Sequence, residues 1–169
     1  FRKGGGTFST TIASVEKIRE RGLHIGAIQT TTRASLSHPD EIVQTYVDHG
    51  FESVFVRPLT PLGKARANWD QIGYSTEEYL EFYRRVVDKV ISVNRAGMFF
   101  REEHASILMG RIEGKLVNYM ELRSPCGAGV GQLAYYPNGK VFTCDEGRMV
   151  YEMGDDAFCL GDVQEGGYS

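Results

Sequence analysis

The sequence predicts an α/β fold in which βα units with parallel strands are followed by a small module containing a β-hairpin. Helical and extended apolar patterns alternate through the first half of the 169 residues, with the two strongest strands about 30 residues apart. The strand at 53–58 is a nearly continuous apolar run, which suits a buried parallel sheet. Beyond residue 115 the chain is rich in glycine, and Pro137-Asn138-Gly139 between two extended runs is a strong hairpin signal.

The first predicted elements are a helix, a strand and a second helix. Thr7 can cap a helix whose apolar residues recur at helical spacing as far as Gly22. Residues 23–31 then predict a strand. The second helix begins at Pro39, a residue that suits a first helical turn, and ends at Gly50.

A second strand at 53–58 leads through a predicted loop at 59–74 into a longer helix. Ser75-Thr76-Glu77-Glu78 is a capping box that opens this helix. Its apolar residues fall on one face: Leu80, Tyr83, Val86, Val87, Val90 and Ile91. Residues 1–94 supply two to three βα units, whereas a complete (β/α)₈ barrel needs about 250 residues. We therefore expect the closing part of a partial barrel, the alternative being a small open α/β sheet complete in itself.

The organisation of the chain changes after residue 94. A helix is predicted over 101–113, and short extended runs follow from residue 115, with hairpin strands at 132–136 and 140–143. The sequence thus divides into three parts: βα units at 1–94, a linker helix within 95–114, and a small module at 115–169.

Composition and charge exclude several classes of protein. A hydrophobic content of 41% and a charged content of 24% are ordinary for a soluble globular chain. A net charge of −3 gives no reason to expect nucleic acid or an anionic membrane as partner. No apolar run approaches the roughly 20 residues of a membrane helix, and Phe1-Arg2-Lys3-Gly4 does not begin a signal peptide. We expect a cytoplasmic protein of which this chain is a cut piece.

Three cysteines, Cys126, Cys144 and Cys159, lie in the last part of the chain. An odd number without an export signal argues against a disulfide framework. Thiolates are soft ligands suited to zinc or to iron–sulfur clusters, and the hairpin can bring Cys126 and Cys144 to the same end. Zinc is the weaker candidate because it prefers four ligands. The alternative is a set of buried structural thiols.

The sequence motifs around these cysteines resemble the SPASM/twitch region of radical S-adenosylmethionine (SAM) enzymes. That family pattern is a Cys, nine to fifteen residues, a Gly, four residues and a Cys, followed later by an apolar-Gly-Asn/Asp-Val turn. Here Cys126 is followed by twelve residues, Gly139, four residues and Cys144, and then by Leu160-Gly161-Asp162-Val163. The resemblance implies that Cys126 and Cys144 ligate an auxiliary [4Fe–4S] cluster. Cys159 is either a third ligand or a packed thiol.

The first half of the chain resembles the later part of the radical SAM barrel. Arg2, followed after Lys3 by Gly-Gly-Gly-Thr-Phe, is similar to the segment after the fourth strand, where an Arg helps bind SAM. Thr30-Thr31-Thr32-Arg33 resembles the end of the fifth strand. The stretch Val54 to Gly63 resembles the sixth, where main chain near Leu59 would lie against the adenine. Arg57 at the end of that strand suits a carboxylate of SAM or of a peptide, or it closes the barrel mouth through backbone carbonyls.

The resemblance implies a peptide or protein maturase that abstracts hydrogen from its substrate, similar to maturases of His-Xaa-Ser peptide systems or to anaerobic sulfatase-maturating enzymes. The signature Cys-x₃-Cys-x₂-Cys of the catalytic cluster does not occur in this sequence. We therefore expect this piece to be inactive by itself. In peptide-oxidising members an Asp in the position of Asp145 accepts a proton, so the resemblance implies a catalytic role for Asp145. The alternative is that Asp145 is a surface residue that opens a turn.

A different class of function remains open. The cysteine region would then be a non-catalytic metal-binding or peptide-docking module attached to part of a barrel. In either case a partial barrel exposes apolar sheet edges, so we expect the chain to associate with itself.

Overall fold

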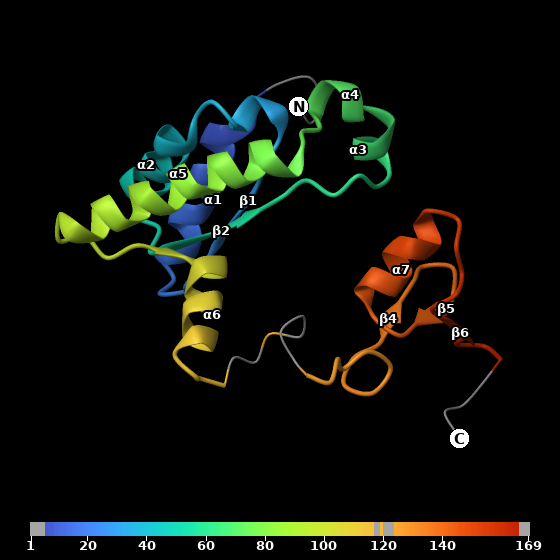
Figure 1. The fold of residues 1–169 in the computed structure, drawn as a ribbon. Helices are drawn as coiled ribbons and strands as arrows, with labels where there is room; N and C mark the ends of the chain where they lie inside the picture. Colours follow the sequence, from blue (N-terminus) through green and yellow to red (C-terminus); the bar gives the residue numbers. More distant parts are fainter. Residues whose placement is uncertain (1–5, 117–118, 120–123, 166–169) are drawn as a thin grey trace. The chain divides into compact units, whose positions relative to one another are not determined.

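The computed structural model describes residues 6–116, 119 and 124–165, so Arg2 lies outside the described residues. The chain forms two compact units, one made of 1–59 and 71–109 and the other of 60–70 and 110–169 (Figure 1). No helix in the described ranges combines the length and the hydropathy needed to cross a lipid bilayer.

The first unit is built on a parallel sheet with the order β1-β2-β3. Its strands are β1 (Ala27–Thr30), β2 (Ser53–Arg57) and β3 (Arg101–Glu102). Ala27 of β1 lies opposite Val54 of β2, and the register continues to Thr30 opposite Arg57. β3 pairs only with the first two residues of β2. The predicted parallel βα arrangement is therefore present, with β2 in the centre.

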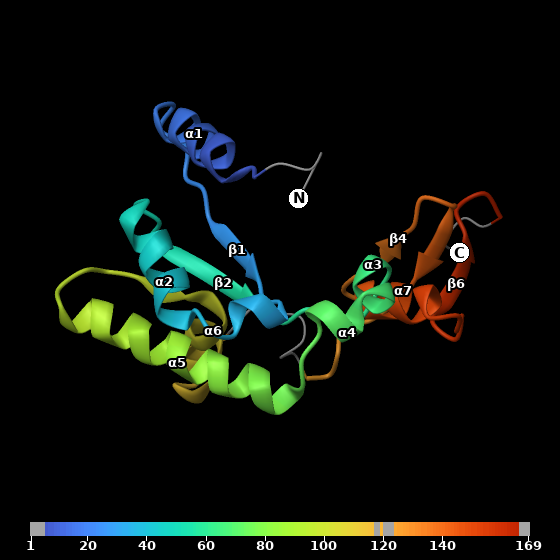
Figure 2. The ribbon, with the colours of Figure 1, turned by 90° about the horizontal axis from the view of Figure 1, so that it is seen from above.

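Two helices cover one face of β1 and β2: α2 (Pro39–Asp48) and α5 (Thr76–Arg95), as Figure 2 shows. The core between them is almost wholly valine and phenylalanine, contributed by both helices and by β2. It includes Val43, Val47, Val54, Val56, Phe82, Val86, Val90, Val93 and Phe100. Burying each of these side chains contributes about 1.5–3 kcal/mol, so the core dominates the stability of the unit.

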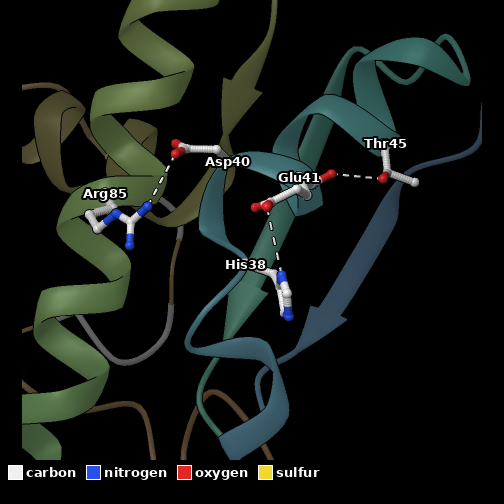
Figure 3. Close-up of polar contacts among 5 residues, drawn as sticks. All are labelled: His38, Asp40, Glu41, Thr45 and Arg85. Atoms are coloured by element: carbon white, nitrogen blue, oxygen red, sulfur yellow. Dashed lines mark hydrogen bonds and ion pairs between the residues drawn. The ribbon is translucent and has the colours of Figure 1, made fainter.

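Polar contacts at the rim of the core are weaker. Arg85 of α5 pairs with Asp40 of α2 at 3.2 Å, and His38 faces Glu41 at 3.7 Å (Figure 3). All four side chains are about half exposed or more, so each pair contributes at most about 1 kcal/mol. Only the pair of Arg85 and Asp40 joins the two helices, and the pair of His38 and Glu41 lies within the first turn of α2.

Helix α5 begins as its sequence predicts. Glu78 N–H donates to Ser75 Oγ at 3.2 Å, and Ser75 N–H donates to the Glu78 carboxylate at 2.7 Å. This reciprocal pair is the predicted capping box, and it places the first residue of α5 at Thr76.

Several local expectations were wrong in detail. The first strand begins at Ala27 and not at residue 23, because residues 23–25 precede the stretch that β2 can pair with. The predicted loop at 59–74 contains two short helices, α3 (Lys64–Ala67) and α4 (Trp69–Ile72). The helix expected over 101–113 is preceded by β3 and runs as α6 (Glu103–Ile112).

The buried Glu102 explains that last difference. Its carboxylate accepts the N–H of Val56 at 3.0 Å and the N–H of Ala105 at 2.7 Å. The first bond continues the ladder beside β2 where β3 has ended, and the second occupies a free N–H in the first turn of α6. One side chain thus marks the change from strand to helix. The first helix of the chain, α1 (Phe8–Arg19), also ends earlier than Gly22.

The second unit is a three-stranded antiparallel sheet with the order β4-β5-β6. Its strands are β4 (Ala134–Tyr135), β5 (Lys140–Phe142) and β6 (Cys159–Asp162), and α7 (Asp145–Glu152) lies between β5 and β6 in the chain. The predicted pairing around Pro137-Asn138-Gly139 is present, with Ala134 opposite Phe142. Phe142 is fully buried and packs its ring against Tyr151 of α7 at 5.1 Å, which holds the helix on the sheet.

Candidate functional site

The carboxyl ends of β1 and β2 bring two predicted site residues together. Thr30 and Arg57 are the last residues of their strands and lie opposite one another in the ladder. Thr31 N–H extends this ladder by one bond, to Arg57 O at 2.9 Å. Both the Thr30 and the Arg57 side chains are exposed. Parallel α/β folds place their sites at this edge, so the position agrees with a binding role.

Leu59, the third predicted residue of this edge, is held by a tyrosine. Leu59 N–H donates to Tyr74 Oη at 2.6 Å, and Tyr74 Oη donates to Thr31 O at 3.2 Å. Burial raises the pKa of Tyr74 above its ordinary value, and the bond from Leu59 opposes the rise in part. Sequence reasoning missed Tyr74. Its only local signal is its place directly before the capping box of α5.

Side-chain hydrogen bonds between buried polar residues stabilise the backbone at the end of β1. The fully buried Thr31 donates from Oγ1 to Gln29 Oε1 at 3.0 Å. Gln29 in turn donates from Nε2 to Thr30 O at 3.1 Å. A satisfied buried network of this kind fixes the local backbone, because each group would lose a bond on moving. The edge formed by Thr30, Arg57 and Leu59 is therefore rigidly set.

Two arginines contribute charge at this edge in different ways. Arg57 places its guanidinium over the ring of Phe55, 5.1 Å from the centroid. Arg33, in the single turn after β1, lies 3.8 Å from the carboxylate of Glu78 on α5. Arg33 is thus partly neutralised, whereas the ring beneath Arg57 orients a guanidinium without neutralising it.

In the second unit, Cys144 is the N-cap residue of α7. Its Sγ accepts the N–H of Gly147 at 3.2 Å, and the hydroxyl of Thr143 lies 3.8 Å away. A Cβ on Gly147 would lie 2.7 Å from the Cβ of Phe158, so only glycine allows this approach. The half-buried Cys144 sulfur is therefore held by the first turn of the helix.

Cys126 is exposed and lies just before a tight turn. The carbonyl oxygen of Gly127 accepts from the N–H of Gly131 at 2.7 Å, and Gly129 N–H donates to Thr143 O at 2.7 Å. The second bond fastens the segment after Cys126 to the residue before Cys144. The two predicted ligands thus come from segments that are hydrogen-bonded to each other.

Cys159 lies in β6, opposite Phe142, with its Sγ 3.8 Å from the carbonyl of Gly161. Among the described residues, no three or more His, Cys, Asp or Glu side chains group closely enough to hold a metal ion. A [4Fe–4S] cluster ordinarily takes four thiolates. Cys126 and Cys144 fit part of such a ligand set, the described residues do not complete one, and ligation by all three cysteines stays a prediction.

The other two segments of the cysteine motif, Gly139 and Gly161-Asp162-Val163, contact each other in the structure. Val163 N–H donates to Gly139 O at 2.9 Å, and Asp162 lies opposite Lys140 in the sheet. Gly139 has φ of +90°, and a Cβ there would lie 2.8 Å from the carboxylate of Asp162. The glycine of the turn and the later Gly-Asp-Val segment therefore pack against each other at the end of the hairpin.

Asp145 is the first residue of α7 and pairs with Arg148 at 2.8 Å. Its side chain is 56% exposed. The guanidinium of Arg148 also lies 5.9 Å from the ring centroid of Tyr136, whose hydroxyl donates to Glu152. Within the second unit Asp145 is thus a surface carboxylate at a helix N-terminus, paired with Arg148. Its catalytic role as a proton acceptor stays a prediction.

The fold is similar to that of solved structures of one radical SAM peptide-modifying maturase. Among solved structures the chain is similar to native anSMEcpe with bound AdoMet, a radical SAM anaerobic sulfatase-maturating enzyme, at a TM-score of 0.69 and 17% identity over 95% of this chain. Native anSMEcpe with bound AdoMet and Kp18Cys peptide gives a TM-score of 0.65 and 16% identity over 95% of this chain. At such identities the likeness establishes the fold.

The chain spans about two fifths of the length of these structures, 41% of the first and 42% of the second. No protein-family model matches the chain, and no curated protein matches it.

Proposed function

We propose that this chain is part of a radical SAM maturase that abstracts hydrogen from a peptide or protein substrate. The observation that carries the proposal is a fold likeness covering 95% of the chain, across both the parallel-sheet unit and the cysteine-bearing unit. The AdoMet and the peptide of the similar structures are bound to those proteins; for this chain both ligands are part of the proposal.

The edge formed by Thr30, Arg57 and Leu59, at the carboxyl ends of β1 and β2, would contact SAM. The N–H of Leu59 is occupied by Tyr74, so its carbonyl oxygen is the main-chain group that can accept from the adenine amino group. Thr30 ends the neighbouring strand, opposite Arg57. Arg57, oriented by Phe55, suits a carboxylate of SAM or of the peptide. Arg2, outside the described residues, completes the proposed set.

The hairpin unit would contribute ligands to an auxiliary [4Fe–4S] cluster. Cys126 and Cys144 are the proposed ligands, with Cys159 as a third. Such a cluster would supply an acceptor for the electron that a substrate radical loses when it is oxidised, and the carboxylate of Asp145 is proposed to accept the proton released in that oxidation. The Cys-x₃-Cys-x₂-Cys motif of the catalytic cluster does not occur in these 169 residues, so the chain by itself is proposed to be inactive.

Anaerobic reconstitution with iron and sulfide tests the cluster assignment. The unaltered chain is expected to give a brown sample with the broad visible absorbance of an iron–sulfur cluster. Cys126→Ala and Cys144→Ala are each expected to abolish that absorbance, and Cys159→Ala separates a third ligand from a packed thiol. An unchanged spectrum in both of the first two variants would refute the assignment.

The second candidate is a non-catalytic metal-binding or peptide-docking module. It is favoured by the position of Asp145, whose side chain is exposed and paired with Arg148. Metal analysis of protein purified without oxygen separates the two proposals, because this one predicts zinc or no metal where the first predicts iron and sulfide.

A further inference from the structure

Three tyrosines stack in a column along the start of α5. The rings of Tyr74 and Tyr79 are 5.9 Å apart and inclined by 13°, and those of Tyr79 and Tyr83 are 5.8 Å apart and inclined by 22°. All three hydroxyls bond to groups of the sheet or of the segments that leave it. Tyr79 donates to Val56 O at 3.3 Å, and Tyr83 donates to the carboxylate of Glu102.

Tyr74 differs from the other two because its hydroxyl bridges two chain segments. It accepts from Leu59 N–H and donates to Thr31 O, at 2.6 and 3.2 Å. Leu59 lies two residues beyond the end of β2, and Thr31 lies one residue beyond the end of β1. The last main-chain hydrogen bond between the two strands joins Thr31 and Arg57. Beyond that bond, the hydroxyl of Tyr74 links the two chain segments and sets the distance between them.

A single hydroxyl can do this only while it is protonated, because it must donate and accept at once. A tyrosine hydroxyl is protonated at physiological pH, and burial raises the pKa of Tyr74 further above its ordinary value. The stacked Tyr79 ring limits the positions that the Tyr74 ring can take. The bridge is therefore a fixed part of the edge that carries Thr30, Arg57 and Leu59.

We propose that Tyr74 is a positioning residue for binding of an adenosyl group at this edge. The bond from Leu59 N–H fixes the orientation of that residue's backbone and leaves its carbonyl oxygen to accept from the purine amino group. The inference rests on the proposed function of the edge, and it adds a residue that acts through Leu59 and Thr31 without touching the ligand itself.

Tyr74→Phe tests this role, with Tyr79→Phe as the matched control. Both changes remove one hydroxyl and keep the ring in the same stack, but only the first removes the bridge between the strand ends. Binding of S-adenosylhomocysteine, a stable adenosyl probe, is measured by ligand-detected NMR and titration on the whole chain. Tyr74→Phe is expected to weaken binding about tenfold, the scale of one lost hydrogen bond, while Tyr79→Phe leaves it unchanged.

Amide exchange supplies the second readout. Tyr74→Phe is expected to speed exchange of Leu59 N–H selectively, with little change in melting temperature. Equal affinity of the unaltered chain and Tyr74→Phe would overturn the positioning role alone, as would equal weakening by Tyr79→Phe. If the unaltered chain does not bind the probe, the proposed function of the edge fails, and the role of Tyr74 fails with it.

Discussion

The hydroxyl of Tyr83 on α5 donates to the carboxylate of Glu102, which is only 2% exposed. The same carboxylate accepts from two main-chain N–H groups, those of Val56 on β2 and Ala105 on α6. One buried side chain therefore joins a strand and two helices, and this junction leads to the first two predictions.

Glu102→Ala is expected to destabilise the first unit by on the order of 3 kcal/mol, because it leaves buried donors without an acceptor. Chemical denaturation followed by circular dichroism measures the loss. Glu103→Ala is the control, since its carboxylate makes only a surface pair with Arg101 at 3.4 Å and is expected to change stability by less than about 1 kcal/mol. Equal losses for the two variants would contradict the role of Glu102 as a buried junction.

Stability should fall at alkaline pH because of the tyrosine column. Burial, followed by the bond to Glu102, raises the pKa of Tyr83 above its ordinary 10.0, and burial likewise raises that of Tyr79. A group with a raised folded-state pKa stabilises the fold fully below its unfolded pKa, and this stability is lost as pH rises from about 10 towards the folded pKa. Tyr83→Phe should make the free energy of unfolding less sensitive to pH above 10. An unaltered slope would show that the column does not cause it.

Gly147→Ala is expected to destabilise the second unit by about 1–3 kcal/mol, because the added Cβ would overlap Phe158. The shift should also break the bond from Gly147 N–H to Cys144 Sγ and speed alkylation of Cys144. Thermal melting and thiol-labelling rates measure the two effects. Gly26→Ala is the control, since no atom lies within 4 Å of a Cβ there. Wild-type labelling of Cys144 in Gly147→Ala would rule out this packing effect.

Ser75→Ala should cost about 1 kcal/mol through loss of the capping box of α5. Because Tyr74 directly precedes this cap, we also expect faster exchange of the first amides of α5. Urea denaturation gives the first quantity and hydrogen exchange the second. Thr76→Ala, which keeps the cap, should change neither.

Local signals explain which parts of the fold could be predicted. The capping box and the helix of α5, and the Pro-Asn-Gly turn of the hairpin, lie within short stretches of sequence and are confirmed. The predicted apolar face of α5 was only partly right, because Leu80 and Ile91 are exposed while Phe82 and Val93 are buried. β3 has two residues, and its Glu102 carboxylate accepts from the N–H of Val56, 46 residues away, so no local pattern reveals it.

The same distinction holds for the candidate site. Thr30, Arg57 and Leu59 follow recognisable strands, and the parallel register brings the strand ends together. Tyr74 reaches Thr31 across 43 residues, and that contact exists only once α5 has packed on the sheet. The pairing of Asp145 with Arg148 is local, at helical spacing, but it depends on the helix α7, whereas the sequence reading weighed only a catalytic Asp145 and a surface turn.

The central claim is that Cys126 and Cys144 belong to an iron–sulfur site of a radical SAM maturase. The ⁵⁷Fe Mössbauer spectrum of the anaerobically reconstituted chain tests it most directly. We expect the quadrupole doublet of a [4Fe–4S] cluster in the unaltered chain and its loss in the Cys126→Ala, Cys144→Ala double variant. A spectrum containing only unspecifically bound iron, or the same doublet in the double variant, would contradict the claim.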